Sequence, residues 1–222
     1  MNHAAASPVP AVDTCVPVGP WGLPADLVVP AGARGLVVFA HGSGSSRLSP
    51  RNRFVARVLH DHGLGTLLMD LLGPGEDSDR QRVFDIPHLA ARVMGVLDDL
   101  PTLREMPAPL AQRPVGLFGA STGAAAALQA AAVRPSRVSA VVSRGGRVDL
   151  APDARAVRSP TLLIVGGSDG EVLRLNRLTL QALICEKDLV VVPGATHLFE
   201  EPGTLEDVAR LAAQWFVRHA PA

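Results

Sequence analysis

The chain has 222 residues, with 21 basic and 21 acidic side chains, 47% hydrophobic residues and 19% charged residues. This length and composition predict one globular domain with a core of its own and exclude a disordered chain. The even charge balance excludes a long-range field that would steer nucleic acid or an anionic membrane toward the protein. The sequence has no unbroken apolar run of about 18 residues, so we expect no membrane-spanning helix.

Cysteine usage and the N-terminal residues favour a cytoplasmic protein. Cys15 and Cys185 are the only cysteines, and two free thiols are typical of a reducing compartment. The N-terminal segment has no basic start and is interrupted by prolines, which is unlike a secretory signal. We expect residues 1–10 to form a loose tail and residues 11–222 to form the domain.

Strand and helix patterns alternate along most of the chain. Residues 12–30 are predicted to form two strands around a turn that contains glycine and proline. Later apolar runs are short and bounded by Gly, Pro or Asp, as strands buried on both faces of a sheet are. These runs cover residues 36–40, 66–69, 115–118, 138–142, 161–165 and 189–192. Helices are predicted over residues 51–62, 87–100 and 205–217 from amphipathic spacing, and over 124–133 from alanine content.

This order of elements predicts the fold class. Two leading strands are followed by alternating strands and helices up to the end of the chain. Such alternation is typical of an α/β sandwich with right-handed crossovers. We therefore expect a single domain with a mostly parallel sheet of about eight strands, flanked by helices.

The segment Gly119-Ala120-Ser121-Thr122-Gly123 has the pattern G-x-S-x-G between a predicted strand and a predicted helix. In this context the serine lies on a sharp turn that lifts its hydroxyl clear of the sheet. The flanking positions must be small because strand and helix then lie close together. The N–H of Thr122, at the helix N-terminus, is placed to stabilise an oxyanion. We predict that Ser121 is a nucleophile; the alternative is a tight turn with an ordinary capping serine.

A second loop of small residues, HGSGSS at 41–46, follows the third predicted strand. Hydrolases with this kind of serine turn take their second oxyanion donor from this loop. We predict that the Ser43 amide is that donor. His41 is expected to shape the loop rather than to perform chemistry. The alternative is a flexible Gly/Ser turn.

An activated serine needs an imidazole in contact and a carboxylate that orients the imidazole. In this fold the chain order is Ser, then Asp or Glu, then His. His197 follows the last predicted strand on a loop, which is where such a base belongs. His219 is the only other histidine after Ser121, and we expect it to be solvated near the C-terminus.

Asp169 is the predicted acid, because it follows the strand 161–165 in the segment GGSDG. Asp149 is the competitor, although its surroundings are more typical of a helix start. Glu200 and Glu201 follow His197 closely, and we expect them to favour the start of the final helix.

Four segments occur together in this order: HGSGSS, GASTG, GGSDG and GATH. With them the chain resembles the α/β-hydrolase superfamily over nearly its whole length, and its short form resembles the dienelactone hydrolase-like branch. The resemblance implies an α/β-hydrolase fold and a catalytic triad. Dienelactone hydrolases proper use a cysteine nucleophile where this chain has Ser121, so lactone specificity is not implied. The short gap between Arg144 and Thr161 leaves no room for a lid domain.

Arg144 is predicted to lie near the carboxyl ends of the strands. One hypothesis is that Arg144 holds an acidic or polar ester substrate, because a guanidinium binds carboxylate or phosphate through two hydrogen bonds. The alternative is internal pairing with Glu76, Asp77 or Asp149, since most charged side chains serve solubility or local pairing.

Together these residues predict a serine hydrolase that cleaves small carboxylic esters by two-step acyl transfer. His197 takes the Ser121 proton, Ser121 attacks the carbonyl, and the Ser43 and Thr122 amides hold the oxyanion. This mechanism needs no metal and no organic cofactor, and its expected partner is a small-molecule ester. Rival interpretations use the same triad on a lactone, thioester or amide, or for acyl transfer to another acceptor. A further rival is a catalytically silent hydrolase fold that serves as a binding module.

Overall fold

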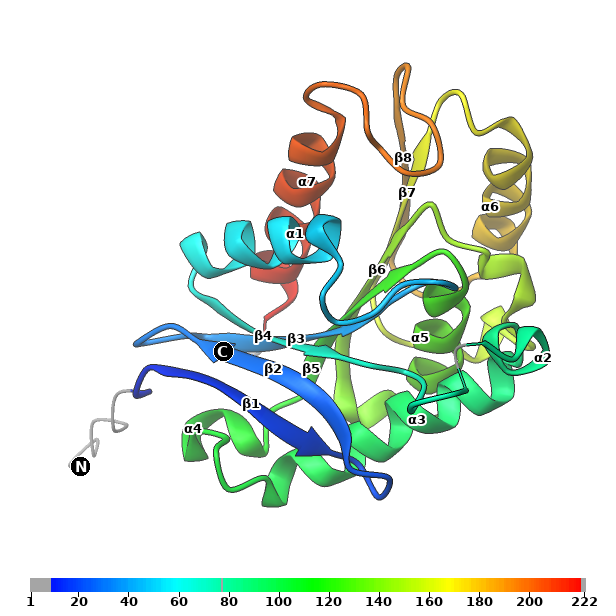
Figure 1. The fold of residues 1–222 in the computed structure, drawn as a ribbon. Helices are drawn as coiled ribbons and strands as arrows, with labels where there is room; N and C mark the ends of the chain where they lie inside the picture. The colour runs from blue at the N-terminus through cyan, green and yellow to red at the C-terminus, as the bar shows by residue number, and fades with distance from the viewer. Residues whose placement is uncertain (1–8, 77, 221–222) are drawn as a thin grey trace.

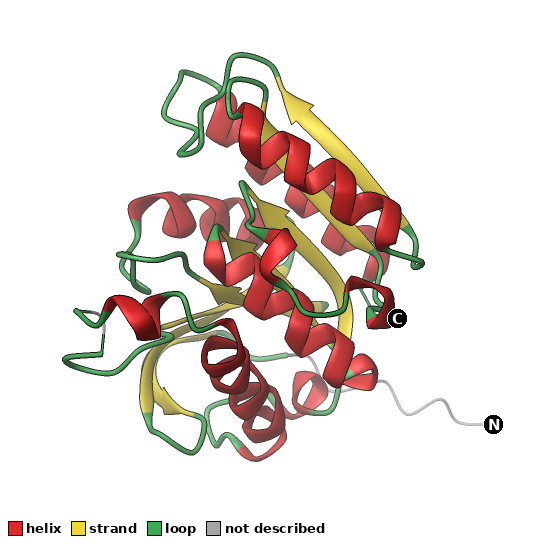
Figure 2. Cartoon of the chain, turned by 90° about the vertical axis from the view of Figure 1, so that its right-hand side faces the viewer, coloured by secondary structure: helices red, strands yellow, loops and turns green. Residues whose placement is uncertain are grey.

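The computed structural model of the chain describes residues 9–76 and 78–220. Within these residues the chain forms one eight-stranded sheet with helices on both faces (Figures 1 and 2). The strands are β1 (Val12–Val18), β2 (Leu23–Val29), β3 (Gly35–Ala40), β4 (Leu64–Met69), β5 (Val115–Ala120), β6 (Val138–Arg144), β7 (Thr161–Gly166) and β8 (Lys187–Val192). The longer helices are α1 (Pro50–Asp61), α3 (Ile86–Asp99), α5 (Thr122–Val133), α6 (Gly170–Ala182) and α7 (Thr204–His219). The short ones are α2 (Arg80–Val83), η1 (Leu100–Thr102), α4 (Ala108–Ala111), η2 (Pro135–Arg137), η3 (Val148–Leu150) and η4 (Ala154–Ala156).

The strand order across the sheet is β1-β2-β4-β3-β5-β6-β7-β8. Strands β3 to β8 run parallel to one another, whereas β1 and β2 form an antiparallel hairpin, and β2 pairs antiparallel with β4. Ala40 pairs with Gly119, and Ala120 pairs with Arg144. The carboxyl ends of β3, β5 and β6 therefore meet at one edge of the sheet, which is where open α/β sheets bind their ligands.

Two apolar cores lie on the two faces of the sheet. Figure 1 shows α1 and α7 on one face and α3, α5 and α6 on the other. Side chains alternate along β3: Leu36 and Val38 pack toward α3 and α5, while Val37 and Phe39 pack toward α1 and α7. The Phe39 ring lies against the Phe118 ring of β5, with 4.8 Å between their centroids. Both faces of the central strands are therefore buried, which explains their unbroken apolar sequences.

The predicted fold class is confirmed. Each predicted strand and helix overlaps an observed one, and the ends differ by a few residues. Strands β5 and β6 run on to Ala120 and Arg144, so both end directly beside the predicted nucleophile. Between β6 and β7 the chain forms only the short turns η3 and η4, so no lid domain is inserted there.

The predicted loose tail, residues 1–10, falls mostly outside the described residues. Val9 is described, is buried in the core, and accepts a hydrogen bond from the Gly32 N–H at 2.9 Å. No helix in the described part of the chain is both long enough and apolar enough to cross a membrane.

We expect Phe118→Ala to lower the free energy of unfolding by about 3–5 kcal/mol, because it removes a fully buried ring and leaves a cavity beside Phe39. Urea unfolding followed by circular dichroism measures this. Val133 on α5 is half exposed, and Val133→Ala is expected to change the same quantity by less than about 0.5 kcal/mol. Equal, small effects of both substitutions would contradict this description of the core.

Candidate active site

Ser121 lies between the end of β5 and the start of α5, in a backbone conformation that is unusual for serine. Its φ is 50° and its ψ is −121°. Apart from Phe199, it is the only described non-glycine residue with a positive φ. The Ser121 N–H donates to the Arg144 carbonyl at 3.2 Å, and the Arg147 N–H donates to the Ser121 carbonyl at 3.0 Å. These bonds to the segment after β6 hold the strained turn in place.

Two glycines allow the strand and the helix to approach each other at this turn. A Cβ on Gly119 would lie 2.4 Å from the Ala124 Cα. A Cβ on Gly123 would lie 2.2 Å from the Ala40 carbonyl oxygen at the end of β3. Both contacts would be clashes with backbone, so the small flanking residues predicted from the motif are a steric requirement.

The predicted acid and base come together from the loops after β7 and β8. The His197 Nδ1–H donates to Asp169 Oδ2 at 2.7 Å. The two loops are also joined by their backbones, because the Gly167 N–H donates to the Val192 carbonyl at 2.8 Å and the Ser168 N–H donates to the Ala195 carbonyl at 2.9 Å. The Asp169 carboxylate therefore orients the imidazole and leaves its Nε2 for a second partner.

Ser121 and His197 line one cavity of about 190 Å³, together with Gly42, Ser43 and Arg144. The described residues include no direct hydrogen bond between the Ser121 hydroxyl and the His197 ring. Such bonds are often long in unliganded sites and shorten when substrate binds. The structure therefore places the predicted nucleophile and base on the wall of the same cavity.

The predicted oxyanion loop lies against the serine turn. The Ser43 N–H donates to the Thr122 Oγ1 at 3.0 Å, so this amide lies beside the N-terminus of α5. Thr122 is the first residue of that helix, and its own N–H has no partner within the helix. The predicted pair of donors, Ser43 and Thr122, is thus brought together. The hydrogen bond to the threonine side chain was not predicted.

His41 shapes this loop, as predicted. The Leu71 N–H donates to His41 Nε2 at 2.9 Å, and His41 Nδ1 donates to the Gly42 carbonyl at 2.9 Å. Burial lowers the pKa of His41 below its usual value of 6.5. Its imidazole is therefore neutral near pH 7 and ties the loop after β3 to the end of β4.

The alternative acid and base lie elsewhere. Asp149 pairs with the Arg147 guanidinium at 2.9 Å. His219 is not solvated as expected: it belongs to α7, and its ring packs 4.7 Å from the Trp215 ring. The next residue, Ala220, lies near Gly35 at the amino end of β3, so His219 is at the opposite edge of the sheet from Ser121.

Glu201 does support the start of α7, because its carbonyl accepts a hydrogen bond from the Thr204 N–H at 3.1 Å, but the side chains of Glu200 and Glu201 have other partners. Glu201 accepts a hydrogen bond from the Thr196 N–H at 3.1 Å, and Glu200 pairs with Arg51 at 3.1 Å. Both carboxylates therefore support the His197 loop and its surroundings, and the first turn of α7 has other acidic residues.

Arg144 is buried, with 8% of its surface exposed. The two described carboxylates that were offered as internal partners pair with other arginines: Glu76 with Arg82 and Arg92, and Asp149 with Arg147. The third, Asp77, lies outside the described residues. Burial, and then the nearby charge of Arg51, lower the pKa of Arg144 to about 10.

Gly145 is a residue that the sequence analysis missed. It has a φ of +52°, and a Cβ there would lie 3.2 Å from the His197 carbonyl oxygen and 3.5 Å from the His197 ring. The backbone after β6 thus forms a wall against which the His197 ring packs. Its signal in the sequence was a glycine shortly after the predicted strand 138–142.

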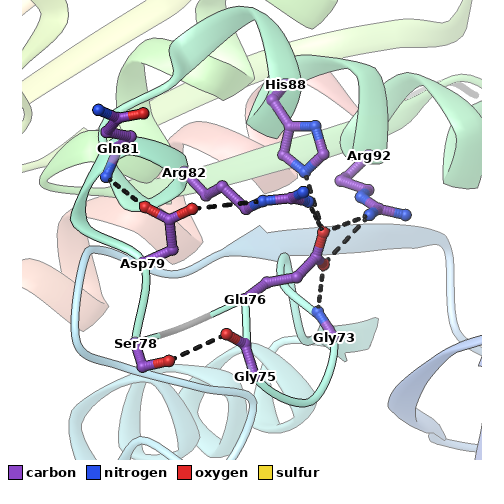
Figure 3. Close-up of polar contacts among 9 residues, drawn as sticks. All are labelled: Gly73, Gly75, Glu76, Ser78, Asp79, Gln81, Arg82, His88 and Arg92. Atoms are coloured by element: carbon purple, nitrogen blue, oxygen red, sulfur yellow. Dashed lines mark hydrogen bonds and ion pairs between the residues drawn. The ribbon is translucent and has the colours of Figure 1, made fainter.

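A second cavity, of about 290 Å³, is also lined by the oxyanion loop. Its wall includes Gly73, Pro74 and Val83 from the segment after β4. Figure 3 shows how this segment is held: the Glu76 carboxylate accepts a hydrogen bond from the Gly73 N–H at 2.7 Å and pairs with Arg82 and with Arg92.

The hydrogen bond from the Gly73 N–H is the largest cause that lowers the pKa of Glu76, and the positive charge of Arg92 and the hydrogen bond and positive charge of Arg82 lower it further. A carboxyl group with a lowered pKa stabilises the fold at a pH above its unfolded value of 4.5, and this contribution is lost as the pH falls through the folded value. The charged form of Glu76 therefore stabilises the wall of the second cavity at neutral pH.

We expect Glu76→Gln to lower the free energy of unfolding by about 1–2 kcal/mol at pH 7, because it removes charge-assisted hydrogen bonds that are partly screened by solvent. The difference from wild type should shrink as the pH falls below about 4.5. Urea unfolding at a series of pH values measures it. Glu105 is exposed, and Glu105→Gln serves as the matched control. A difference for Glu76→Gln that did not change with pH would contradict the charged network.

The described residues contain no group of three or more His, Cys, Asp or Glu side chains that could hold a metal ion. The chemistry that this site offers from its own residues is a serine hydroxyl, an imidazole oriented by a carboxylate, and two amides.

Comparison with known proteins agrees with the fold. A family model described as the alpha/beta hydrolase fold matches residues 35–157, a range that includes the HGSGSS loop and Ser121. The chain therefore belongs to the α/β-hydrolase fold family.

Within this family the chain is dienelactone hydrolase-like. It is 51% identical to a dienelactone hydrolase from Anabaena variabilis, with a TM-score of 0.85 over 96% of this chain and 99% of that one. XC6422 from Xanthomonas campestris, described as a serine hydrolase without a lid, shares the fold at 22% identity and a TM-score of 0.70, over 96% of each chain.

Two curated relatives from Mycobacterium tuberculosis strains are longer than this chain. They are 54% identical over 220 residues, which are 99% of this chain and 49% of the relatives. The chain thus spans about half the length of these relatives, which carry the name "Putative phosphoribosyl transferase".

Proposed function

We propose that the protein is a serine hydrolase that cleaves small carboxylic esters through an acyl-enzyme. The observation that carries the proposal is the His197–Asp169 hydrogen bond of 2.7 Å on the wall of the cavity that also contains Ser121. A nucleophile, a base and a group that orients the base are the parts that such catalysis needs. The strained backbone of Ser121 supports the same assignment, because strain of this kind gathers at functional sites.

The mechanism begins when substrate enters the cavity and the His197 ring takes the Ser121 proton. Ser121 Oγ then forms a bond to the substrate carbonyl carbon, and the N–H groups of Ser43 and Thr122 stabilise the oxyanion. The imidazolium returns its proton to the departing alcohol, and the ester bond breaks. Water, deprotonated by the same imidazole, then attacks the acyl-enzyme and releases the acid.

Two names among the related proteins bear on the substrate. The Anabaena relative is named a dienelactone hydrolase, so a lactone is the second candidate substrate for the same triad. The phosphoribosyl transferase name belongs to the longer mycobacterial proteins as wholes, and this chain, which aligns with 49% of their length, has the hydrolase fold. Thioesters, amides and other acyl acceptors are further uses of the same residues.

We expect Ser121→Ala to lower kcat for a short-chain 4-nitrophenyl ester by about 10⁴–10⁶-fold, because it removes the nucleophile. The rate is measured by stopped-flow or steady-state absorbance at about 400 nm, near the absorption maximum of the 4-nitrophenolate product. The exposed Ser136 lies in η2, before the amino end of β6 and away from the carboxyl edge where Ser121 lies, and Ser136→Ala should keep the wild-type rate.

A fluorophosphonate probe separates an enzyme from a silent binding module. We expect one equivalent to react with wild type and none with Ser121→Ala, since only an activated serine reacts. Hydrolysis by Ser121→Ala at the wild-type rate, or no labelling of wild type, would refute the proposal.

We expect Asp169→Asn to lower kcat by about 10³–10⁴-fold with little change in KM, because an amide does not hold His197 in the tautomer that accepts the serine proton. The same assay measures it. Asp149→Asn is the matched control, because Asp149 pairs with Arg147 instead, and it should stay within a few-fold of wild type. A larger loss for Asp149→Asn than for Asp169→Asn would identify the wrong acid.

A further inference from the structure

Asn176 is a buried polar side chain that the proposed mechanism does not use. It lies in the middle of α6 with 0% of its surface exposed. Its Nδ2 atom donates to the Gly146 carbonyl and to the Val172 carbonyl, each at 2.8 Å. Its Oδ1 atom is buried and has no hydrogen-bond partner in the described part of the chain. Because an unpaired buried acceptor is unfavourable, stability alone does not account for an asparagine at this position.

The two hydrogen bonds that Asn176 donates have different consequences. Val172 lies four residues earlier on the same helix, so the bond to its carbonyl fixes the asparagine side chain against α6. The bond to Gly146 reaches the segment after β6, 30 residues away in the sequence. Gly146 is buried, and a buried carbonyl needs a hydrogen-bond donor. Asn176 therefore connects α6 to the backbone of residues 145–147.

Residues 145–147 contact both the predicted nucleophile and the predicted base. The Arg147 N–H donates to the Ser121 carbonyl at 3.0 Å. A Cβ on Gly145 would lie 3.5 Å from the His197 ring, so this backbone lies against the imidazole. Gly146 lies between these two contacts. A shift of Gly146 therefore moves the supports of Ser121 and His197 together.

The backbone at Gly146 is also confined by packing. A Cβ at this position would clash with the Ser143 Oγ on β6 and with the Ala124 Cβ on α5. The backbone of Gly146 therefore lies directly against β6 and α5. Its position is set by this packing together with the hydrogen bond that its carbonyl accepts from Asn176 on α6.

We propose that Asn176 is a positioning residue of the active site, which fixes residues 145–147 through the Gly146 carbonyl and thereby aligns Ser121 with His197. This role rests on the proposed hydrolase function. Asn176 acts through the backbone and not on the substrate, so it determines how well the reacting groups are aligned. A misplacement of reacting groups by about 1 Å costs on the order of 10²-fold in rate.

The first test is Asn176→Leu, which removes the donor at nearly constant side-chain volume. The measurement is kcat/KM for methyl butyrate and for 4-nitrophenyl butyrate. We expect a loss of about 10- to 100-fold with the methyl ester and a severalfold smaller loss with the 4-nitrophenyl ester. The reason is that His197 must protonate departing methoxide, whereas 4-nitrophenolate leaves without a proton.

The comparison of two esters separates positioning from a loss of folded protein. A purely structural role would lower the folded fraction and reduce both rates by the same factor. An equal loss with the two esters, or no loss, would therefore overturn the proposal. Thr179→Val is the matched control and should keep both wild-type rates. Thr179 is also buried on α6, and in the described part of the chain no hydrogen bond joins its side chain to residues 145–147.

Folding of the variant depends on two opposing effects. Asn176→Leu removes the unpaired Oδ1, but it also removes the donor to the Gly146 carbonyl. Should Asn176→Leu not fold, Asn176→Ser replaces it in both tests, because a serine side chain is too small to overpack α6 and too short to make both hydrogen bonds. Failure of both variants to fold would show that the amide serves the fold as a whole and would overturn the proposal.

The second test needs no turnover and measures hydrogen exchange of the Arg147 N–H by NMR. We expect this N–H to exchange at least about tenfold faster in Asn176→Leu than in wild type, because residues 145–147 open more readily. Thr179→Val should exchange as wild type does. Unchanged exchange in Asn176→Leu would overturn the proposal. The exchange rate is measured whether or not the protein hydrolyses esters, so a failed positioning role and a failed hydrolase assignment give different results.

Discussion

The close approach of α5 to the ends of β3 and β5 is the constraint on which the rest of the site depends. Gly119 and Gly123 permit that approach, and the alanine-rich face of α5 is completely buried behind it. The approach forces Ser121 into a positive φ of 50°, and the buried core stabilises this strain. The turn between β5 and α5 therefore fixes the position of the Ser121 hydroxyl and places the Thr122 N–H at a helix N-terminus. It also brings Ser121 beside the backbone of Arg144.

The acid and base depend on backbone contacts as much as on their own hydrogen bond. Ser168 donates to the Ala195 carbonyl, so the loops that carry Asp169 and His197 are tied together before the side chains meet. Phe199 follows His197 on the same loop and anchors that loop. It has a φ of 56°, and it is 2% exposed in the core under α1 and α7. A bulky residue in that conformation needs compensation from packing. The apolar core therefore contributes directly to the position of the base.

The sequence was sufficient for the fold because both faces of the central strands are buried, which leaves short apolar runs that are easily recognised. It also predicted Ser121, Asp169 and His197, since each lies in the turn or loop after a strand, and strand ends meet at one edge of a parallel sheet. Contacts between distant segments could not be predicted in this way. The burial of His219 against Trp215 depends on where α7 packs. Arg144 has no acidic partner among the described residues because the candidate carboxylates pair with other arginines. A pattern along the chain does not show which of these ion pairs form.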